Sequence, residues 1–182
     1  MSALRLRRED TALLLIDVQE RLAAAMPPAE LERMLRRTAG LIEGARALAL
    51  PISLTEQYPR GLGPTVASLR DRLPGIAPVE KLRFGALDER VRAGLANRVH
   101  VLVAGMETHV CVYQTVRQLS DEGFRPVLCA DAVISRFAID HAQGLRLAEG
   151  AGATVATVEA VLFDLLGEAG TPEFKRVSAA IR

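Results

Sequence analysis

A carboxylate, an ammonium group and a thiol each follow an apolar segment of strand length. Asp17 ends one such segment, Lys81 follows another, and Cys111 comes a short polar turn after a third. In an open parallel sheet, ligands bind at the carboxyl ends of the strands, where these three side chains would converge. A lysine can stabilise a thiolate, and an aspartate can take the thiol proton and later deliver it to a leaving group. The three residues together therefore predict nucleophilic catalysis.

Cys111 lies where a predicted strand passes into a segment with helical spacing of apolar residues, which runs to Glu122. At a helix N-terminus the free N–H groups and the helix dipole favour negative charge, so a thiol there is expected to lose its proton more easily. The alternative is a small buried hydrophobic residue. We interpret Cys129, which ends the apolar run 126–129, in that second way.

Asp17 and Lys81 also have structural alternatives. Asp17 could cap the helix that follows it, and Lys81 could be a solvated loop charge. The conjunction with Cys111 favours a common site over three separate structural roles.

Apolar runs of strand length alternate with segments of helical period, which predicts an α/β protein with a parallel sheet whose two faces are both covered. The predicted strands are 12–17, 51–55, 78–80, 99–104, 125–130 and 153–157. The predicted helices are 28–48, 88–97, 110–122, 139–150, 158–166 and 172–181. Residues 56–78 hold several prolines and glycines and are interpreted as a long crossover loop with a functional role.

The length and composition favour one domain spanning residues 1–182. Its 23 basic and 22 acidic residues nearly cancel and its aromatic content is 4%, so nucleic acid is not expected as a partner. No apolar run has the span of a signal segment or a transmembrane helix, and the two cysteines form no disulfide framework. We expect a cytoplasmic protein with a small-molecule substrate and no membrane association.

The chain resembles the isochorismatase-like cysteine hydrolase superfamily in three motifs. These are Asp17 in Leu-Ile-Asp-Val-Gln, Lys81 in Lys-Leu-Arg-Phe-Gly, and Cys111 at the end of Gly-Met-Glu-Thr-His-Val-Cys. Segments 54–66 and 172–175 are similar to the isochorismatase domain-containing protein 2 subgroup. The resemblance implies a three-layer αβα fold with a doubly wound, six-stranded, mostly parallel sheet. It also implies a homo-oligomer, a dimer or larger.

The same resemblance implies a catalytic triad of Cys111, Asp17 and Lys81. It further implies a cis peptide between Met106 and Glu107, which would direct the N–H groups of Glu107 and Cys111 toward an oxyanion. The expected activity is hydrolysis of a small amide or related C–N bond through a thioester intermediate. The alternatives are a non-catalytic interaction or regulatory module and a thiol redox sensor.

Nicotinamidase-like members of this superfamily bind a divalent metal after the second strand, where this chain has Glu56, Gln57 and Tyr58. The histidines His100, His109 and His141 are scattered and do not supply a spaced ligand set. We expect neither metal nor cofactor, and His109 is not assigned as the catalytic base.

Four further residues are candidates for lining the substrate pocket, namely Gln19, Gln57, Tyr58 and Phe84. Gln19 could instead cap a helix, and Phe84 could be part of the core. Glu107 either shapes substrate choice or binds a neighbouring loop through hydrogen bonds.

Overall fold

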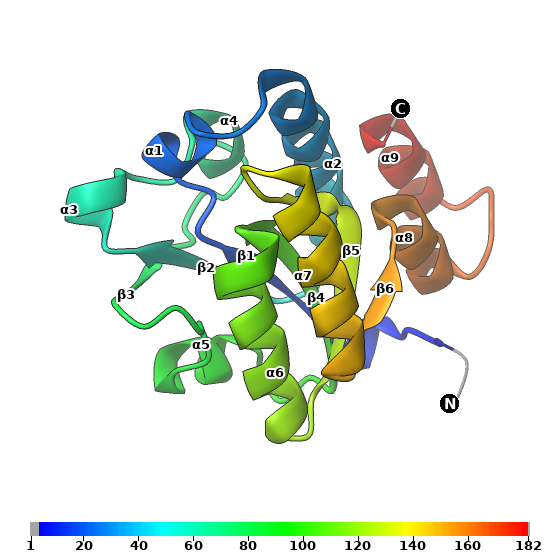
Figure 1. Ribbon diagram of the computed structural model, residues 1–182. Coiled ribbons are helices and arrows are strands. Elements are labelled where there is room, and N and C mark those ends of the chain that lie inside the picture. The colour runs from blue at the N-terminus through cyan, green and yellow to red at the C-terminus, as the bar shows by residue number, and fades with distance from the viewer. Residues whose placement is uncertain (1–3, 182) are drawn as a thin grey trace.

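Six parallel strands form one sheet in the computed structural model, which describes residues 4–181 (Figure 1). The strand order is β3-β2-β1-β4-β5-β6, and every paired neighbour is parallel. The strands are β1 (Thr11–Ile16), β2 (Ile52–Gln57), β3 (Val79–Lys81), β4 (His100–Met106), β5 (Arg125–Ile134) and β6 (Thr154–Ala156). The predicted α/β fold is confirmed, and the sheet is parallel throughout rather than mostly so.

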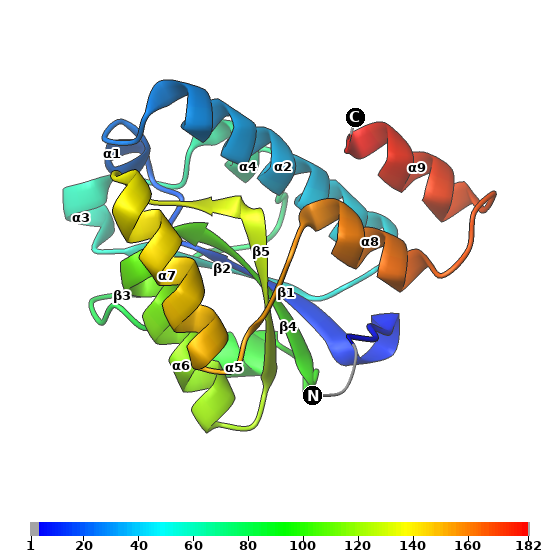
Figure 2. The ribbon, with the colours of Figure 1, turned by 45° about the vertical axis from the view of Figure 1, so that its right-hand side comes forward.

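Helices cover both faces of the sheet (Figure 2). One face carries α2 (Pro28–Ala47), α8 (Val158–Leu166) and α9 (Pro172–Ala180), and the other carries α5 (Glu89–Gly94), α6 (Tyr113–Asp121) and α7 (Ala138–Gly150). Successive side chains of a strand point to opposite faces. Accordingly Leu13 and Leu15 join the core on the α2 side, while Leu14 and Ile16 join the core on the α6 side. A continuous apolar strand therefore supplies two cores at once.

The chain reverses its direction of winding between β1 and β4, the two central strands. It moves from β1 through β2 to β3 on one side, returns to β4, and then moves through β5 to β6 on the other. Such a switch point, at the carboxyl ends of the strands, is where open α/β sheets bind ligands. Asp17 follows β1 at this point, and the turn that leads to Cys111 follows β4.

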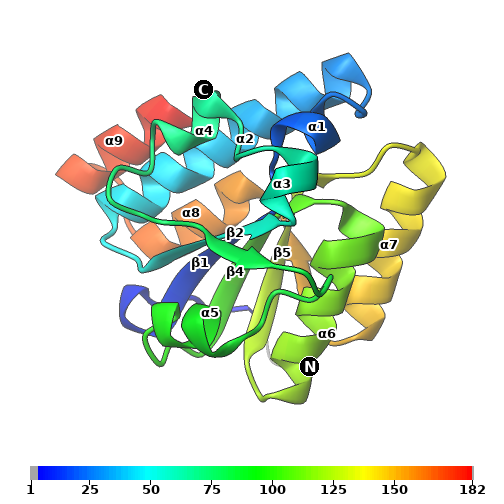
Figure 3. The same ribbon diagram turned by 90° about the vertical axis from the view of Figure 1, so that its left-hand side faces the viewer.

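The connection from β2 to β3 contains two short helices, α3 (Pro59–Leu62) and α4 (Ala67–Arg70) (Figure 3). The segment between these two helices is held to the end of β2 because the buried Glu56 carboxylate accepts hydrogen bonds from both the backbone N–H and the hydroxyl of Thr65, each at 2.7 Å. Gln19, just before the short helix α1 (Glu20–Ala23), forms an antiparallel bridge with Thr65. The predicted long loop thus contains two short helices and packs beside the end of β1.

Two of the differences from the predicted bounds bear on the site. Strand β5 continues to Ile134, four residues beyond the predicted end, because its last residues pair with the end of β4 after a register irregularity. The helix after β4 begins earlier than predicted, with a π-helical turn over Thr108–Val112 that runs directly into α6. Cys111 therefore lies within the first turn of helical backbone. A 3₁₀ turn over Arg8–Asp10 precedes β1.

Candidate active site

Asp17 and Lys81 form a buried ion pair at the carboxyl ends of β1 and β3. The lysine Nζ lies 2.5 Å from Oδ2 of Asp17, and the two side chains are 6% and 0% exposed. The second carboxylate oxygen, Oδ1, accepts a hydrogen bond of 2.7 Å from the hydroxyl of Thr55 on β2. Residues of three strands therefore fix the orientation of the Asp17 carboxylate.

The Lys81 ammonium group has three further oxygen acceptors besides Asp17. They are Oε1 of Gln57 at 2.9 Å and the backbone carbonyls of Phe84 at 3.0 Å and Arg83 at 3.2 Å. An ammonium group has three protons to donate, so these four acceptors saturate it. The lysine is held as a charge at one place and is not a mobile surface group.

The turn before Cys111 starts with a close approach between the two central strands. A Cβ added to Gly105 would lie 2.0 Å from the carbonyl oxygen of Ile16, and the glycine has a φ of +137°, which other residues rarely adopt. The peptide between Met106 and Glu107 is cis. The Glu107 carbonyl then accepts hydrogen bonds from the N–H groups of Val110 at 3.0 Å and Val112 at 3.2 Å. These two donors come immediately before and after Cys111 in the sequence, and the Cys111 N–H is not among the donors to this carbonyl.

Cys111 is buried beside the Asp17–Lys81 pair. Burial is the main cause that raises the pKa of its thiol, to about 12, and the negative charge of Asp17 raises it further. The charge of Lys81 acts in the opposite direction, while a hydrogen bond to Asp17 and the charge of Glu107 add to the increase. The expectation of an easily ionised thiol was wrong, because desolvation and two carboxylates outweigh the helix N-terminus and the lysine.

Glu107, whose side chain is 8% exposed, binds the loop between β5 and α7. Its Oε1 accepts hydrogen bonds from Nε of Arg136 at 3.1 Å and from the backbone N–H of the same residue at 3.2 Å. Of the two roles considered for this glutamate, the structure provides the loop contact. The arginine also places a positive charge beside this carboxylate.

The side chain of Gln19 is fully buried and bonded at both ends to backbone groups. Its Oε1 accepts from the N–H of Gln57 at 2.8 Å, and its Nε2 donates to the carbonyls of Gln57 at 3.0 Å and Gly63 at 2.6 Å. The Gln57 amide is likewise engaged, with Nε2 donating to the carbonyl of Leu82 at 2.8 Å and Oε1 accepting from Lys81. Both glutamines hold the site together, and their amide groups are already occupied.

Tyr58 and Phe84 are half-exposed, at 52% and 53%. Tyr58 follows β2 with a left-handed backbone conformation, and its N–H donates to the carbonyl of Lys81 at 2.9 Å. Phe84 contributes its carbonyl to the Lys81 ammonium group, while its ring lies open to solvent and is not part of the core. These two aromatic rings are the predicted pocket residues whose side chains are accessible to a ligand.

Two threonines at the site were missed in the sequence. Thr55 is the last residue of the second predicted strand, so the rule that selected Asp17 also applied to it. Thr115, one helical turn after Cys111, donates its hydroxyl proton to the Cys111 carbonyl at 2.6 Å and accepts from the N–H of Ala86 at 3.0 Å. Its spacing from Cys111 is that of a threonine bonded to the carbonyl four residues earlier.

His109 and His141 both lie where the π-helical turn packs against α7, whereas His100 begins β4 beside Asp10. His109 Nδ1 bonds the hydroxyl of Ser135 at 3.0 Å, and His141 Nδ1 bonds that of Thr108 at 2.9 Å. Burial lowers the pKa of His141. Among residues 4–181, no group of three histidine, cysteine, aspartate or glutamate side chains is placed to hold a metal ion.

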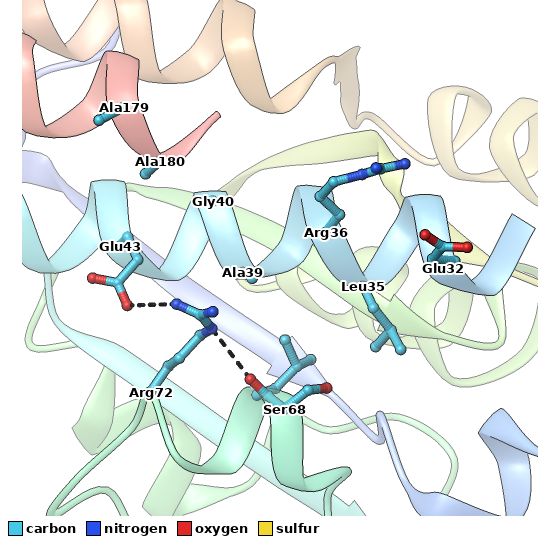
Figure 4. Close-up of a pocket in the computed structure, with 11 residues that line it drawn as sticks. Glu32, Leu35, Arg36, Ala39, Gly40, Glu43, Ser68, Arg72, Ala179 and Ala180 are labelled. Atoms are coloured by element: carbon cyan, nitrogen blue, oxygen red, sulfur yellow. Dashed lines mark hydrogen bonds and ion pairs between the residues drawn. The ribbon is translucent and has the colours of Figure 1, made fainter. Parts of the chain in front are cut away.

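A cavity of about 530 Å³ lies on the outer side of α2, facing α4 and α9 (Figure 4). The Arg72 side chain lines it and donates hydrogen bonds to the carboxylate of Glu43 and to the carbonyl of Ser68, each at 3.2 Å. None of the predicted site residues lines this cavity. It is separate from the site at the carboxyl ends of the strands.

The isochorismatase domain model matches residues 11–160. The chain belongs to the isochorismatase family. Among curated relatives in the family, isochorismatase domain-containing protein 2A of Mus musculus is 33% identical over 98% of this chain and 85% of its own length. The secreted isochorismatase effector Isc1 of Phytophthora sojae is 31% identical over 98% of this chain and 87% of its own length. The predicted resemblance to the protein 2 subgroup is confirmed.

Solved structures of isochorismatase-like proteins superpose on nearly the whole chain. The structure described as MAR1 ribonuclease from Caenorhabditis elegans has a TM-score of 0.89 at 33% identity, covering 98% of this chain and 92% of that one. YcaC of Escherichia coli, described as an octameric hydrolase of unknown specificity, has a TM-score of 0.88 at 24% identity, covering 99% and 92%. Family membership identifies the chain as a hydrolase of this family. Within residues 4–181, no helix is both long and apolar enough to cross a membrane.

Proposed function

We propose that this protein is a metal-independent cysteine hydrolase that cleaves a small amide or related C–N bond, with Cys111, Asp17 and Lys81 as its catalytic residues. The observation that carries the proposal is the buried Asp17 carboxylate, which lies beside the buried Cys111 and raises the pKa of its thiol, while Lys81 lies 2.5 Å from its Oδ2. A carboxylate beside a neutral thiol can remove its proton as the sulfur attacks.

In the proposed first step, the Cys111 proton passes to Asp17 as the sulfur bonds to the substrate carbonyl carbon. The carbonyl oxygen becomes an oxyanion that accepts hydrogen bonds from the N–H groups of Glu107 and Cys111. The carbon–nitrogen bond then breaks, the proton on Asp17 moves to the departing amine, and a thioester remains. Lys81 keeps its proton throughout and stabilises the negative charges around it.

In the second step, Asp17 takes a proton from water as the water oxygen attacks the thioester. The carbon–sulfur bond breaks, the acid is released, and the proton returns from Asp17 to the Cys111 sulfur. The enzyme is then in its starting protonation state. Tyr58 and Phe84 are proposed to contact the substrate with their exposed rings.

The positions of the two cysteines argue against the redox-sensor alternative. Cys129 is fully buried in the core on the α2 side of the sheet, whereas Cys111 belongs to the core on the α6 side. The sheet separates them, so Cys129 cannot resolve an oxidised Cys111 within the fold. The raised pKa of Cys111 also slows oxidation, which follows thiolate character.

The proposal is tested with a panel of small primary and secondary amides, N-carbamoyl compounds and an RNA oligonucleotide, assayed with and without a metal chelator. We expect release of ammonia or amine from a small amide, resistance to the chelator, and loss of turnover in Cys111→Ala. The RNA is included because the relative from Caenorhabditis elegans is described as a ribonuclease. Turnover by Cys111→Ala at the wild-type rate would disprove the nucleophile, and cleavage of RNA alone would disprove the substrate class.

We also propose that the protein is a cytoplasmic homo-oligomer. Phe137 and Ile139, at the start of α7, are 62% and 65% exposed, and large apolar side chains that stand so close together favour contact with a second copy. Size-exclusion chromatography with light scattering is expected to give a multiple of 19.7 kDa. A monomer at all concentrations would contradict the assembly. Cell fractionation tests the location, and the protein is expected in the cytoplasmic fraction.

A further inference from the structure

The loop after β3 supplies two of the four acceptors that hold the Lys81 ammonium group, namely the carbonyls of Arg83 and Phe84. The next residues of this loop are fastened to α6. The N–H of Leu87 donates to Oε1 of Gln118 at 3.1 Å, and the N–H of Ala86 donates to the hydroxyl of Thr115 at 3.0 Å. The place of the lysine charge is therefore set partly by α6, the helix that follows Cys111.

Thr115 connects this loop to the nucleophile directly. Its fully buried hydroxyl donates to the Cys111 carbonyl at 2.6 Å and accepts the N–H of Ala86. A hydroxyl has one proton and two lone pairs, so it can bind a carbonyl and an N–H group at the same time. Valine has nearly the same shape but makes neither bond.

We propose that Thr115 is a positioning residue that fixes the Lys81 ammonium group relative to the Cys111 thiol. Its one hydroxyl binds both the loop after β3 (residues 82–87, here the lysine loop) and the backbone carbonyl of Cys111. The proposal rests on the proposed function of these residues as one site. In Thr115→Val the N–H of Ala86 loses its acceptor, the loop moves away from α6, and the carbonyls of Arg83 and Phe84 move with it. The lysine charge then stabilises negative charge on the sulfur less well.

Thr38 on α2 offers a matched control. It is also fully buried, and its hydroxyl donates to the carbonyl four residues earlier, Met34, at 2.9 Å. Its second recorded contact is the sulfur of the same methionine at 3.7 Å, so both contacts stay within one helix. Thr38→Val therefore removes the same local bond without touching the lysine loop.

The test measures the rate at which iodoacetamide alkylates Cys111 between pH 7 and 10, with peptide mass spectrometry to separate Cys111 from Cys129. We expect Thr115→Val to react at least fivefold more slowly than the wild type across this range. Thr115→Ser, which keeps the hydroxyl, and Thr38→Val should each stay within twofold of it. General loosening of the fold would expose the thiol and speed alkylation, so a slower reaction is not a sign of instability.

Wild-type or faster alkylation of Thr115→Val would overturn the proposal. Equal slowing in Thr115→Ser would also overturn it, because the methyl group and not the hydroxyl would then matter, and so would equal slowing in Thr38→Val. Alkylation requires no substrate, so this result stands even if no amide in the panel is hydrolysed. If an amide is hydrolysed, Thr115→Val should lower kcat at least fivefold with KM within twofold.

Discussion

Replacing Asp17 with asparagine should make Cys111 more reactive toward an alkylating reagent while abolishing hydrolysis. The negative charge of Asp17 and its hydrogen bond to the thiol both raise the pKa of Cys111, and Lys81 lowers it. The Asp17→Asn substitution removes the carboxylate charge that raises the thiol pKa, while the Lys81 charge that lowers it remains. The Cys111 thiolate then becomes the negative group that pairs with the Lys81 ammonium group.

The expected size follows from the raised pKa. At pH 8 a thiol with a pKa of about 12 is ionised in roughly one molecule in 10⁴, against roughly one in ten at its ordinary value of 9.0. Cys111 of the wild type should therefore alkylate on the order of a thousandfold more slowly than an ordinary exposed thiol. Burial is the largest cause and persists in the variant, so we expect Asp17→Asn to recover about tenfold.

The assay follows iodoacetamide labelling of Cys111 from pH 7 to 10 by peptide mass spectrometry. Cys129 serves as the internal control, since burial also raises its pKa and it lies on β5, which β4 separates from β1 and Asp17. Breaking one partner of a buried ion pair costs about 3–5 kcal/mol, so the fold of Asp17→Asn is checked by circular dichroism under the same conditions. Labelling of Cys129 together with Cys111 would reveal unfolding.

A wild-type alkylation midpoint at or below pH 9, or slower labelling in folded Asp17→Asn, would refute the reasoning. The same shift has a consequence for stability. The folded state keeps a proton that the unfolded chain releases, so the contribution of Cys111 is fully present below about pH 9 and is lost as the pH rises toward about 12. Wild-type stability should fall more steeply in that window than the stability of Cys111→Ala.

Three other substitutions test separate parts of the site. Gly105→Ala places a Cβ against backbone of the first strand, so it should lower the midpoint of thermal unfolding by well over 10 °C, whereas an unchanged midpoint would contradict the close approach. Thr55→Val removes a hydrogen bond to Asp17, and we expect kcat/KM to fall by about 1–3 kcal/mol of transition-state free energy in steady-state assays. Glu107→Gln removes a charge that raises the pKa of Cys111, so labelling of that thiol should become faster, and slower labelling would contradict this.

The fold was predictable because the strands of a sheet covered on both faces are apolar throughout and alternate with helical periods. The rule that polar residues at strand ends converge also selected Asp17 and Lys81, which the structure brings into contact. The same rule would have selected Thr55, the last residue of the second predicted strand.

The protonation state of Cys111 could not be predicted in this way. The sequence showed the helix that follows the cysteine, but it did not show that the thiol would be buried against Asp17 and near Glu107. Burial and distance are properties of the tertiary structure, and here they reverse the sign of the pKa shift. The role of Gln19 was hidden for the same reason, because its partners on Gln57 and Gly63 come from a different segment.

Gln19 also explains how β1 can end just before Asp17 without opening the sheet. Its side-chain amide binds both the N–H and the carbonyl of Gln57, the two groups through which a neighbouring strand would pair. A side chain thus takes the place of main chain for one rung of the ladder. The backbone is thereby free to turn at Asp17, where φ is +53°. Glutamate has the same length but lacks the amide donor, so it could copy only half of this rung.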